Sequence, residues 1–123
     1  MSKKFKSPNP VGPYSMFREL SSGGWITSGQ IPIDSESGNL NNRSVEEEVV
    51  QVFNNLEAVL NESGSSFANV VKLNVYLTNL NYFPNVNQYM EKIFPKPFPA
   101  RAVVEVSKLP KDALIEIDAI AKL

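Results

Sequence analysis

The stretch from Phe98 to Ala121, FPARAVVEVSKLPKDALIEIDAIA, carries the clearest alternating pattern in the chain. Because successive side chains of a strand point to opposite faces of a sheet, apolar residues at every second position predict strands. The alternation runs on both sides of a break at residues 108–112, which contains a proline. The stretch therefore predicts two strands with a short connection, and each strand places one apolar face on a core.

The opposite faces of these two strands give the first sign of a site. They carry the cation Arg101 and the carboxylate Glu116 among apolar residues such as Val103 and Leu114. A strand that packs on the core with one face and meets open solvent with the other alternates between apolar and polar residues, so its solvent face is polar. The mixture found here favours a half-buried polar site. We expect Arg101 and Glu116 to share the sheet face that the helices leave open.

The composition excludes several classes of function. The chain has 123 residues, which is typical of one domain with its own core. Its net charge of −1 gives no electrostatic footprint for nucleic acid or an anionic membrane. It has no histidine and no cysteine, so catalysis would rely on carboxylates, tyrosine, lysine, arginine, backbone groups and water. With no membrane-length apolar run and no secretory signal, the expected location is the cytoplasm.

The remainder of the chain predicts three further strands and two helices. Residues 1–13 contain three prolines and predict an extended lead-in. Ser44 with Glu47 forms a capping box for the first helix, Gly64 ends it, and the glutamates at 46–48 predict a solvated first turn. The expected elements are strands at 15–20, 25–27 and 70–78 and helices at 44–63 and 82–94.

This order, β-β-α-β-α-β-β over one domain of residues 1–123, predicts an α+β fold with two helices on one face of a mixed sheet. Along the strand at 70–78, alternation places Val71 inward and Val70 outward, with Lys72 and Asn74 on the open face. That open face is also partly apolar. We therefore expect self-association that covers it, with polar sites close to the subunit boundary.

Five motifs in series resemble those of one known family, the RidA/YjgF proteins, which are reactive-intermediate (enamine/imine) deaminases. The resemblance extends over about residues 8–121, with the motifs in the order and at about the spacing of the family. They are Gly12-Pro13-Tyr14-Ser15, Ser28-Gly29-Gln30-Ile31-Pro32, Phe98-Pro99-Ala100-Arg101, Val104-Glu105-Val106, and Leu109-Pro110-Lys111 through Ile115-Glu116-Ile117.

The resemblance implies a chorismate-mutase-like α+β fold and a homotrimer with clefts between subunits. It also implies hydrolysis of 2-aminoacrylate and related 2-imino acids, which leak from pyridoxal-phosphate enzymes, to 2-keto acids and ammonia. The family uses no cofactor and no metal for this reaction. The implied partners are a small 2-imino or 2-keto acid and further copies of the same chain, with no nucleic acid and no membrane.

Residue roles follow from the same resemblance. Arg101 resembles the arginine that grips the substrate carboxylate, with a planar fork that lysine does not reproduce. Glu116 resembles the glutamate that positions or activates water, and either Tyr14 or a water protonates the enamine form. The cleft-lining residues are Tyr14, Ser28, Gly29, Asn87 and Val103.

Two positions depart from the family pattern. Val103 stands where many members have cysteine, which suggests that no thiol is needed there. Met16 stands where glutamine is frequent, which bears on the preference for the substrate side chain.

Three alternatives stay open at this point. Arg101 and Glu116 would form a stabilising ion pair at a subunit interface if they had no ligand role. A non-catalytic sensor of small carboxylates, such as 2-keto acids or amino acids, would use Arg101 without Glu116. A ribonuclease or translation inhibitor, a role sometimes attributed to this family, is disfavoured by the charge, the lack of histidine and the lack of a basic stripe.

Overall fold

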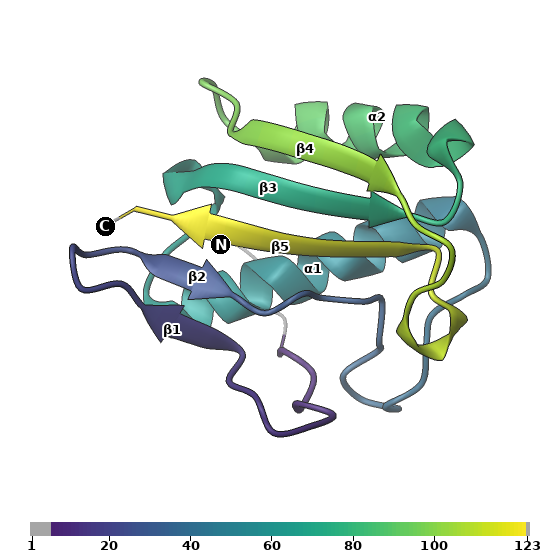
Figure 1. Cartoon of the computed structure of the whole chain (residues 1–123), viewed down its shortest axis with the longest axis horizontal. Coiled ribbons are helices and arrows are strands. Elements are labelled where there is room, and N and C mark those ends of the chain that lie inside the picture. The colour runs from purple at the N-terminus through teal and green to yellow at the C-terminus, as the bar shows by residue number, and fades with distance from the viewer. Residues whose placement is uncertain (1–5, 123) are drawn as a thin grey trace.

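A computed structural model describes residues 6–122 of the chain, and residues 1–5 of the expected lead-in lie outside this range. The molecule has two layers, with two helices packed on one side of a five-stranded sheet (Figure 1). The predicted element order is confirmed. The elements are β1 (Phe17–Glu19), β2 (Trp25–Thr27), α1 (Val45–Ser63), β3 (Val70–Leu77), α2 (Phe83–Ile93), β4 (Ala100–Glu105) and β5 (Ile115–Ala121).

The strand order across the sheet is β1-β2-β5-β3-β4 (Figure 1). All neighbouring strands are antiparallel except β3 and β4, which are parallel and connected through α2. A parallel pair requires such a crossover because the chain must return to the end of the sheet at which the first strand began. The sheet is mixed, as predicted, with β5 near its centre and β4 at one edge.

Helix α1 packs its apolar stripe against the sheet. Its buried side chains include Val52, Phe53 and Leu56, which join the inward side chains of β3 and β5 in one core. Both predicted ends of α1 are confirmed. The hydroxyl of Ser44 accepts a hydrogen bond from the Glu47 N–H at 3.1 Å, and Gly64 ends the helix with a φ of 89°, a conformation that glycine adopts without strain.

The first turn of α1 is less exposed than the sequence predicts. Glu48 is only 1% exposed, and its carboxylate accepts a hydrogen bond from the Leu114 N–H at 2.9 Å. Burial raises the pKa of Glu48, and the hydrogen bond from Leu114 opposes that rise. The prediction of a wholly solvated turn was wrong because the connection before β5 folds over this end of the helix.

The start of β3 also differs from the prediction. Val70 is 5% exposed and Val71 is 43% exposed, so the inward and outward assignments of these two residues are reversed. The pairing of β3 with β5 shifts between Val70 and Lys72. A bulge of this kind moves the alternation by one residue, so a strict period of two fails at that point.

Arg101 lies on the helix side of the sheet, not on the open side as predicted. In the pairing of β4 with β3, Arg101 is opposite Leu73, which is fully buried beneath the helices. Glu116 is opposite Tyr76 on the open side, as expected. Alternation within β4 separates two faces but does not say which one meets the helices. At an edge strand even the helix side reaches water, so a long cation is tolerated there.

The open side of the sheet presents apolar side chains to water in a single copy. Ile26 of β2 is 40% exposed and Val104 of β4 is 46% exposed. Between residues 6 and 122, no helix combines the length and the apolar character required to cross a membrane.

Asn55 of α1 fixes the segment that follows β2. Its side chain is buried and donates hydrogen bonds to the carbonyls of Ile31, at 3.0 Å, and Ile33, at 2.8 Å. Asn55→Ala leaves both carbonyls without this donor, so we expect the free energy of unfolding to fall by about 2–3 kcal/mol. Urea denaturation measures the loss. The matched variant Asn54→Ala, at a partly exposed position, is expected to cost less than about 0.5 kcal/mol, and equal losses for the two variants would contradict this account.

Candidate functional site

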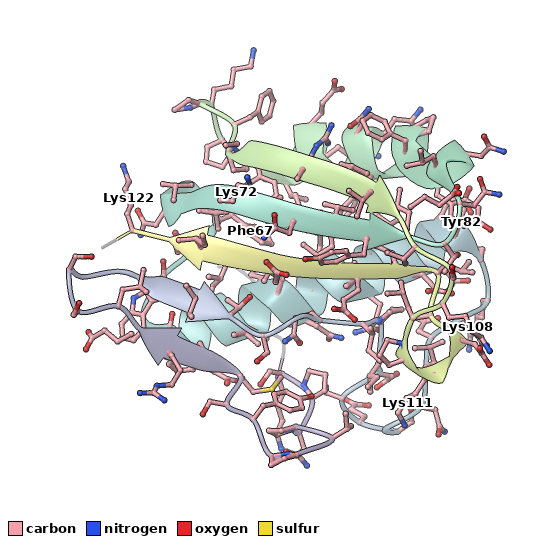
Figure 2. The ribbon with its side chains drawn as sticks, viewed as in Figure 1. Phe67, Lys72, Tyr82, Lys108, Lys111 and Lys122 are labelled. Carbon is pink, nitrogen blue, oxygen red and sulfur yellow. The ribbon has the colours of Figure 1, made fainter. Side chains whose placement is uncertain are left out.

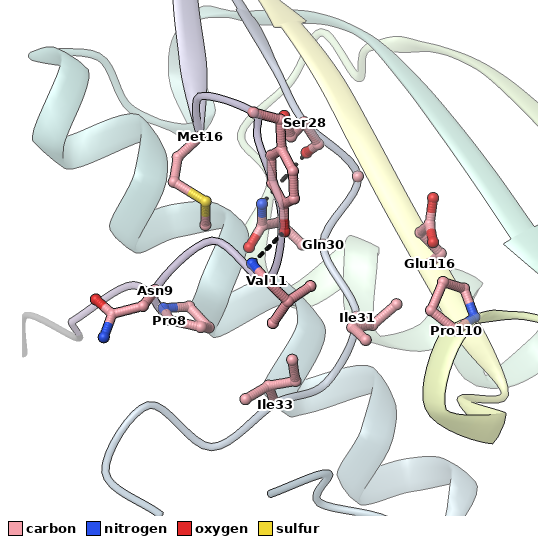
Figure 3. Close-up of a pocket in the computed structure, with 12 residues that line it drawn as sticks. Pro8, Asn9, Val11, Met16, Ser28, Gln30, Ile31, Ile33, Pro110 and Glu116 are labelled. Carbon is pink, nitrogen blue, oxygen red and sulfur yellow. Dashed lines mark hydrogen bonds between the residues drawn. The ribbon is translucent and has the colours of Figure 1, made fainter. Parts of the chain in front are cut away.

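Two cavities contain the predicted site residues. The first, of about 330 Å³, is lined by Tyr14, Ser28, Gly29 and Glu116 together with residues of the lead-in, and we call it the Glu116 cavity (Figure 3). The second, of about 390 Å³, is lined by Asn87, Arg101 and neighbouring residues of α2, and we call it the Arg101 cavity. Six of the seven predicted site residues therefore line a cavity. Within one chain, four of these residues line the Glu116 cavity and two line the Arg101 cavity.

The segment after β2 brings Gly29 against Glu116. The Gln30 N–H donates to the Ile117 carbonyl at 2.7 Å, and the Ile117 N–H donates back to the Gln30 carbonyl at 3.0 Å. This pair of bonds draws the backbone of residue 29 onto β5. A Cβ atom at position 29 would lie 2.9 Å from Cδ of Glu116, too close for any larger residue. Glycine lets the carboxyl group of Glu116 occupy this space, and a larger residue would displace that carboxyl group.

Tyr14 and Ser28 form the rim of the same cavity. The Ser28 hydroxyl donates to the carbonyl of Ser15 and so connects the two segments that enclose the opening. The phenol oxygen of Tyr14 accepts a hydrogen bond from the Val11 N–H at 3.2 Å (Figure 3). Because this oxygen acts as an acceptor, its own hydrogen stays available to a ligand.

The environment of Glu116 favours its protonated form. Burial of the carboxyl group raises its pKa, and the negative charge of Asp118 on the same strand face raises it further. Asp118 is held in place by Asn74, whose side-chain amide donates to it at 2.8 Å. A carboxyl group in a cavity with a perturbed pKa is a candidate for accepting and returning a proton.

The Arg101 cavity contains a guanidinium group that is fixed by helix α2. One nitrogen of Arg101 donates to the side-chain oxygen of Asn87 at 2.7 Å, and the group stacks on the Phe83 ring, 4.8 Å from its centre. This hydrogen bond gives the carboxamide of Asn87 a polar partner next to the buried residues of α2. Burial lowers the pKa of Arg101, yet arginine stays charged in proteins.

Arg101 has no carboxylate partner in the described part of the chain. Among residues 6–122, the ion pair that is present joins Arg43 and Glu47 at 3.9 Å, at the exposed start of α1. A half-buried, oriented guanidinium with unused donors is suited to bind a planar anion such as a carboxylate. Within residues 6–122 there is also no group of three or more acidic side chains placed to hold a metal ion.

Comparisons with known proteins agree with this fold. The profile of the family described as Endoribonuclease L-PSP matches residues 4–123. A RutC family protein of Pyrococcus abyssi is 45% identical over 117 residues, which cover 94% of this chain and 91% of the relative. The crystal structure of RidA from an Antarctic Psychrobacter matches with a TM-score of 0.90 at 36% identity, over 96% of this chain and 94% of that one. The chain belongs to the RidA/YjgF family.

Some relatives carry a name that states an activity, among them proteins of a dust mite and of humans. The human 2-iminobutanoate/2-iminopropanoate deaminase is 41% identical over 116 residues, which cover 94% of this chain and 84% of the human protein. The family membership and the RidA/YjgF fold predicted from the motifs are therefore confirmed.

A single chain of this RidA/YjgF family member keeps Arg101 and Glu116 apart. They lie on opposite sides of the sheet, because Arg101 is opposite the buried Leu73 and Glu116 is opposite Tyr76. An ion pair between them within one chain is therefore excluded. Val103 packs against the core and lines neither cavity, so its role as a cleft residue stays a prediction.

The sequence did not predict several neighbours of the site. The lead-in forms one wall of the Glu116 cavity through Pro8, Asn9 and Val11 (Figure 3). Its prolines predicted an extended segment but gave no sign of where that segment packs. The contact between Phe83 and Arg101 was also missed, since the two residues are distant in sequence and meet only across the sheet edge.

Proposed function

We propose that this RidA/YjgF family member hydrolyses 2-imino acids, including the imine form of 2-aminoacrylate, to 2-keto acids and ammonia. The observation that carries the proposal is the pair of half-sites: a guanidinium at Arg101 that has no carboxylate partner among residues 6–122, and a desolvated carboxyl group at Glu116. The first suits a substrate carboxylate, and the second suits a water molecule. The name of the human relative supports the same reaction.

The complete site would combine two copies of the chain. Because Arg101 and Glu116 lie on opposite sides of one sheet, a small substrate reaches both only if the Arg101 cavity of one copy faces the Glu116 cavity of the next. Such a head-to-tail contact forms a ring where its rotation closes and an open filament where it does not. We propose a ring of three, a homotrimer, in which association also covers exposed apolar residues such as Ile26 and Val104.

The chemistry needs few groups. Arg101 would bind the carboxylate and fix the position of C2, which lowers the entropic cost of attack. Water adds to C2 as Glu116 accepts its proton, and the electron pair of the C=N bond moves to nitrogen, which takes this proton from Glu116 to give a carbinolamine. Glu116 then accepts the proton of the new hydroxyl group as the C=O bond forms and the C–N bond breaks, and it passes this proton to the leaving nitrogen, so that ammonia is released. An enamine first gains a proton at C3, for which Tyr14 at the cavity rim and water are the available donors.

The test generates 2-aminoacrylate in place with a serine dehydratase and traps it with semicarbazide. The wild-type protein is expected to suppress the trapped adduct and to speed the release of pyruvate. Unchanged rates of both processes would remove the deaminase proposal.

A small-carboxylate binder or sensor is the second candidate, and one observation favours it. The anion site formed by Arg101, Asn87 and Phe83 is complete within a single chain and does not depend on Glu116. Tight binding of 2-keto acids without any faster imine hydrolysis would support this role.

The four lysines labelled in Figure 2 give no support to a nucleic-acid partner. Figure 2 shows Lys72 and Lys122 at one end of the sheet and Lys108 and Lys111 at the other, so these lysines do not form one stripe. Binding to a nucleic-acid backbone relies on clustered basic residues along a common track.

The pH dependence of the proposed reaction gives a further prediction. Glu116 must be ionised to accept a proton, so kcat/KM falls as the pH drops through its pKa, which burial and Asp118 raise. Asp118→Asn removes the second cause and lowers that pKa. The acid limb of the pH profile is therefore expected to move to lower pH.

The profile is measured by keto-acid release at a series of pH values. The control is Asp112→Asn, an exposed position in the connection before β5, which should leave the limb in place. If the acid limb does not move in Asp118→Asn, then Asp118 does not raise the pKa of Glu116.

A further inference from the structure

Three segments that are far apart in the sequence meet around the Glu116 cavity (Figure 3). The lead-in lines it with Pro8, the segment after β2 with Ile31, and the connection between β4 and β5, residues 106–114, with Pro110. Segments of this kind, outside the strands and the two α-helices, keep a fixed position only where other parts of the chain bind them. The shape of the cavity therefore depends on contacts made outside it.

One face of helix α1 carries polar side chains at three positions that are seven residues apart. Glu48, Asn55 and Glu62 occupy these positions, and we call them the α1 polar row. Seven residues make nearly two full turns of an α-helix, so the three side chains point in nearly the same direction. Asn55 binds the segment after β2, because its side chain donates hydrogen bonds to the carbonyls of Ile31 and Ile33.

Glu48 binds the connection between β4 and β5. Glu48 is 1% exposed, and its carboxylate accepts a hydrogen bond from the Leu114 N–H at 2.9 Å. Leu114 is the last residue of the connection and precedes Glu116 by two positions. Pro110 of the same connection lines the cavity. The hydrogen bond from Leu114 therefore acts on a wall of the cavity and on the start of the strand that carries Glu116.

The connection needs such a contact because its backbone is strained. Lys111 and Asp112 are consecutive residues with φ values of 57° and 59°. Residues other than glycine adopt this left-handed conformation at a cost in free energy, and it persists only where the surroundings hold it. The hydrogen bond to Glu48 is one of the contacts that hold the connection.

Glu62 binds the lead-in. Its carboxylate accepts a hydrogen bond from the Ser7 hydroxyl at 2.7 Å and another from the Ser7 N–H at 3.3 Å. Ser7 is 8% exposed and directly precedes Pro8, which lines the cavity. The last turns of α1 therefore set the place at which the lead-in joins the cavity wall. Each of the three segments is bound by a different member of the α1 polar row.

We propose that the α1 polar row positions the three segments and so holds the Glu116 carboxyl group in line with the attacking water. This inference rests on the proposed deaminase function. Glu48, Asn55 and Glu62 lie outside the cavity lining, so they are positioning residues that act through the segments they bind. A displacement of about 1 Å in such a site is enough to slow a reaction by about a hundredfold.

Glu62→Ala gives the first kinetic test, because Glu62 is exposed and its loss leaves the core intact. We expect kcat for imine hydrolysis to fall about tenfold, while the affinity for pyruvate, measured by calorimetry, changes by less than about twofold. Ser7→Ala should lower kcat by a similar factor, and the double variant should fall little further, since both changes break the same contact. The control Glu46→Ala removes an exposed glutamate of α1 that binds Asn85 of α2, and it should leave kcat unchanged.

Glu48 separates positioning from folding. Glu48→Gln keeps an oxygen that accepts the Leu114 N–H and should retain kcat within about threefold, whereas Glu48→Ala should lower kcat by about tenfold or more. Each assay is run below the unfolding transition of the variant, so that a loss of folded protein does not contribute. Where Glu48→Ala does not fold, Glu62→Ala and Ser7→Ala decide the question.

Amide hydrogen exchange reports the position of the segments without catalysis. Glu62→Ala should speed exchange in the lead-in alone, and Glu48→Ala in residues 106–114 alone. If the wild-type protein hydrolyses no imine, the deaminase function falls, and exchange then decides: faster exchange confined to the matching segment keeps the α1 polar row, and unchanged exchange removes it. If imines are hydrolysed but kcat stays at the wild-type value in both variants, or falls without faster exchange in the matching segment, the deaminase function stands and the positioning role falls.

Discussion

Arg101→Ala is expected to lower kcat/KM for 2-imino acid hydrolysis by about a thousandfold. The guanidinium is half-buried, stacks on Phe83 and is oriented by Asn87, so its remaining donors are fixed before a ligand arrives. Loss of the cation removes both the attraction for the carboxylate and the placement of C2. The keto-acid product should bind correspondingly more weakly, which calorimetry measures independently of catalysis.

Arg101→Lys tests whether charge alone is sufficient. Lysine keeps the positive charge but lacks the planar fork and the stacking surface, so we expect less than about a tenth of the lost activity to return. The matched control is Arg43→Ala, which removes an arginine whose side chain is 83% exposed on the surface. Activity of Arg101→Ala within about threefold of wild type would show that Arg101 has no ligand role.

Glu116→Gln is expected to reduce kcat by about a hundredfold or more while binding of a stable 2-keto acid changes little. The substitution keeps the size of the side chain beside Gly29 but removes the proton acceptor. A binder that does not catalyse would give a different result, because it uses the Arg101 half-site alone. Full activity in Glu116→Gln would transfer the proton-accepting role to another group or to water.

Mixing the two inactive variants tests the composite site. If each site takes Arg101 from one copy and Glu116 from the next, subunits exchanged at random between Arg101→Ala and Glu116→Gln rebuild intact sites at about one interface in four. Activity should then return to about a quarter of the wild-type value after unfolding and refolding of the mixture. No recovery, with oligomers of mixed composition present, would contradict a site shared between copies.

The sequence by itself determined the elements and the family. Local signals that act over a few residues predicted the elements. They are the capping residues of α1, the alternation in β5, and the glycines and prolines that end helices and strands. For this reason the order of the elements was predicted, and the predicted boundaries of β1, β2, β3 and both helices lie within two residues of those observed.

Only the tertiary structure decided how the site residues are grouped. Alternation in β4 defines two faces but carries no information about which face α2 covers, so Arg101 was placed on the wrong side of the sheet. The bulge at Val70 and the burial of Glu48 arise from pairing and packing with segments far along the chain. The lining of the Glu116 cavity arises in the same way, because it combines the lead-in with the segment after β2, which Asn55 holds in place. Such contacts depend on which surfaces meet in space, and a local sequence pattern does not encode that.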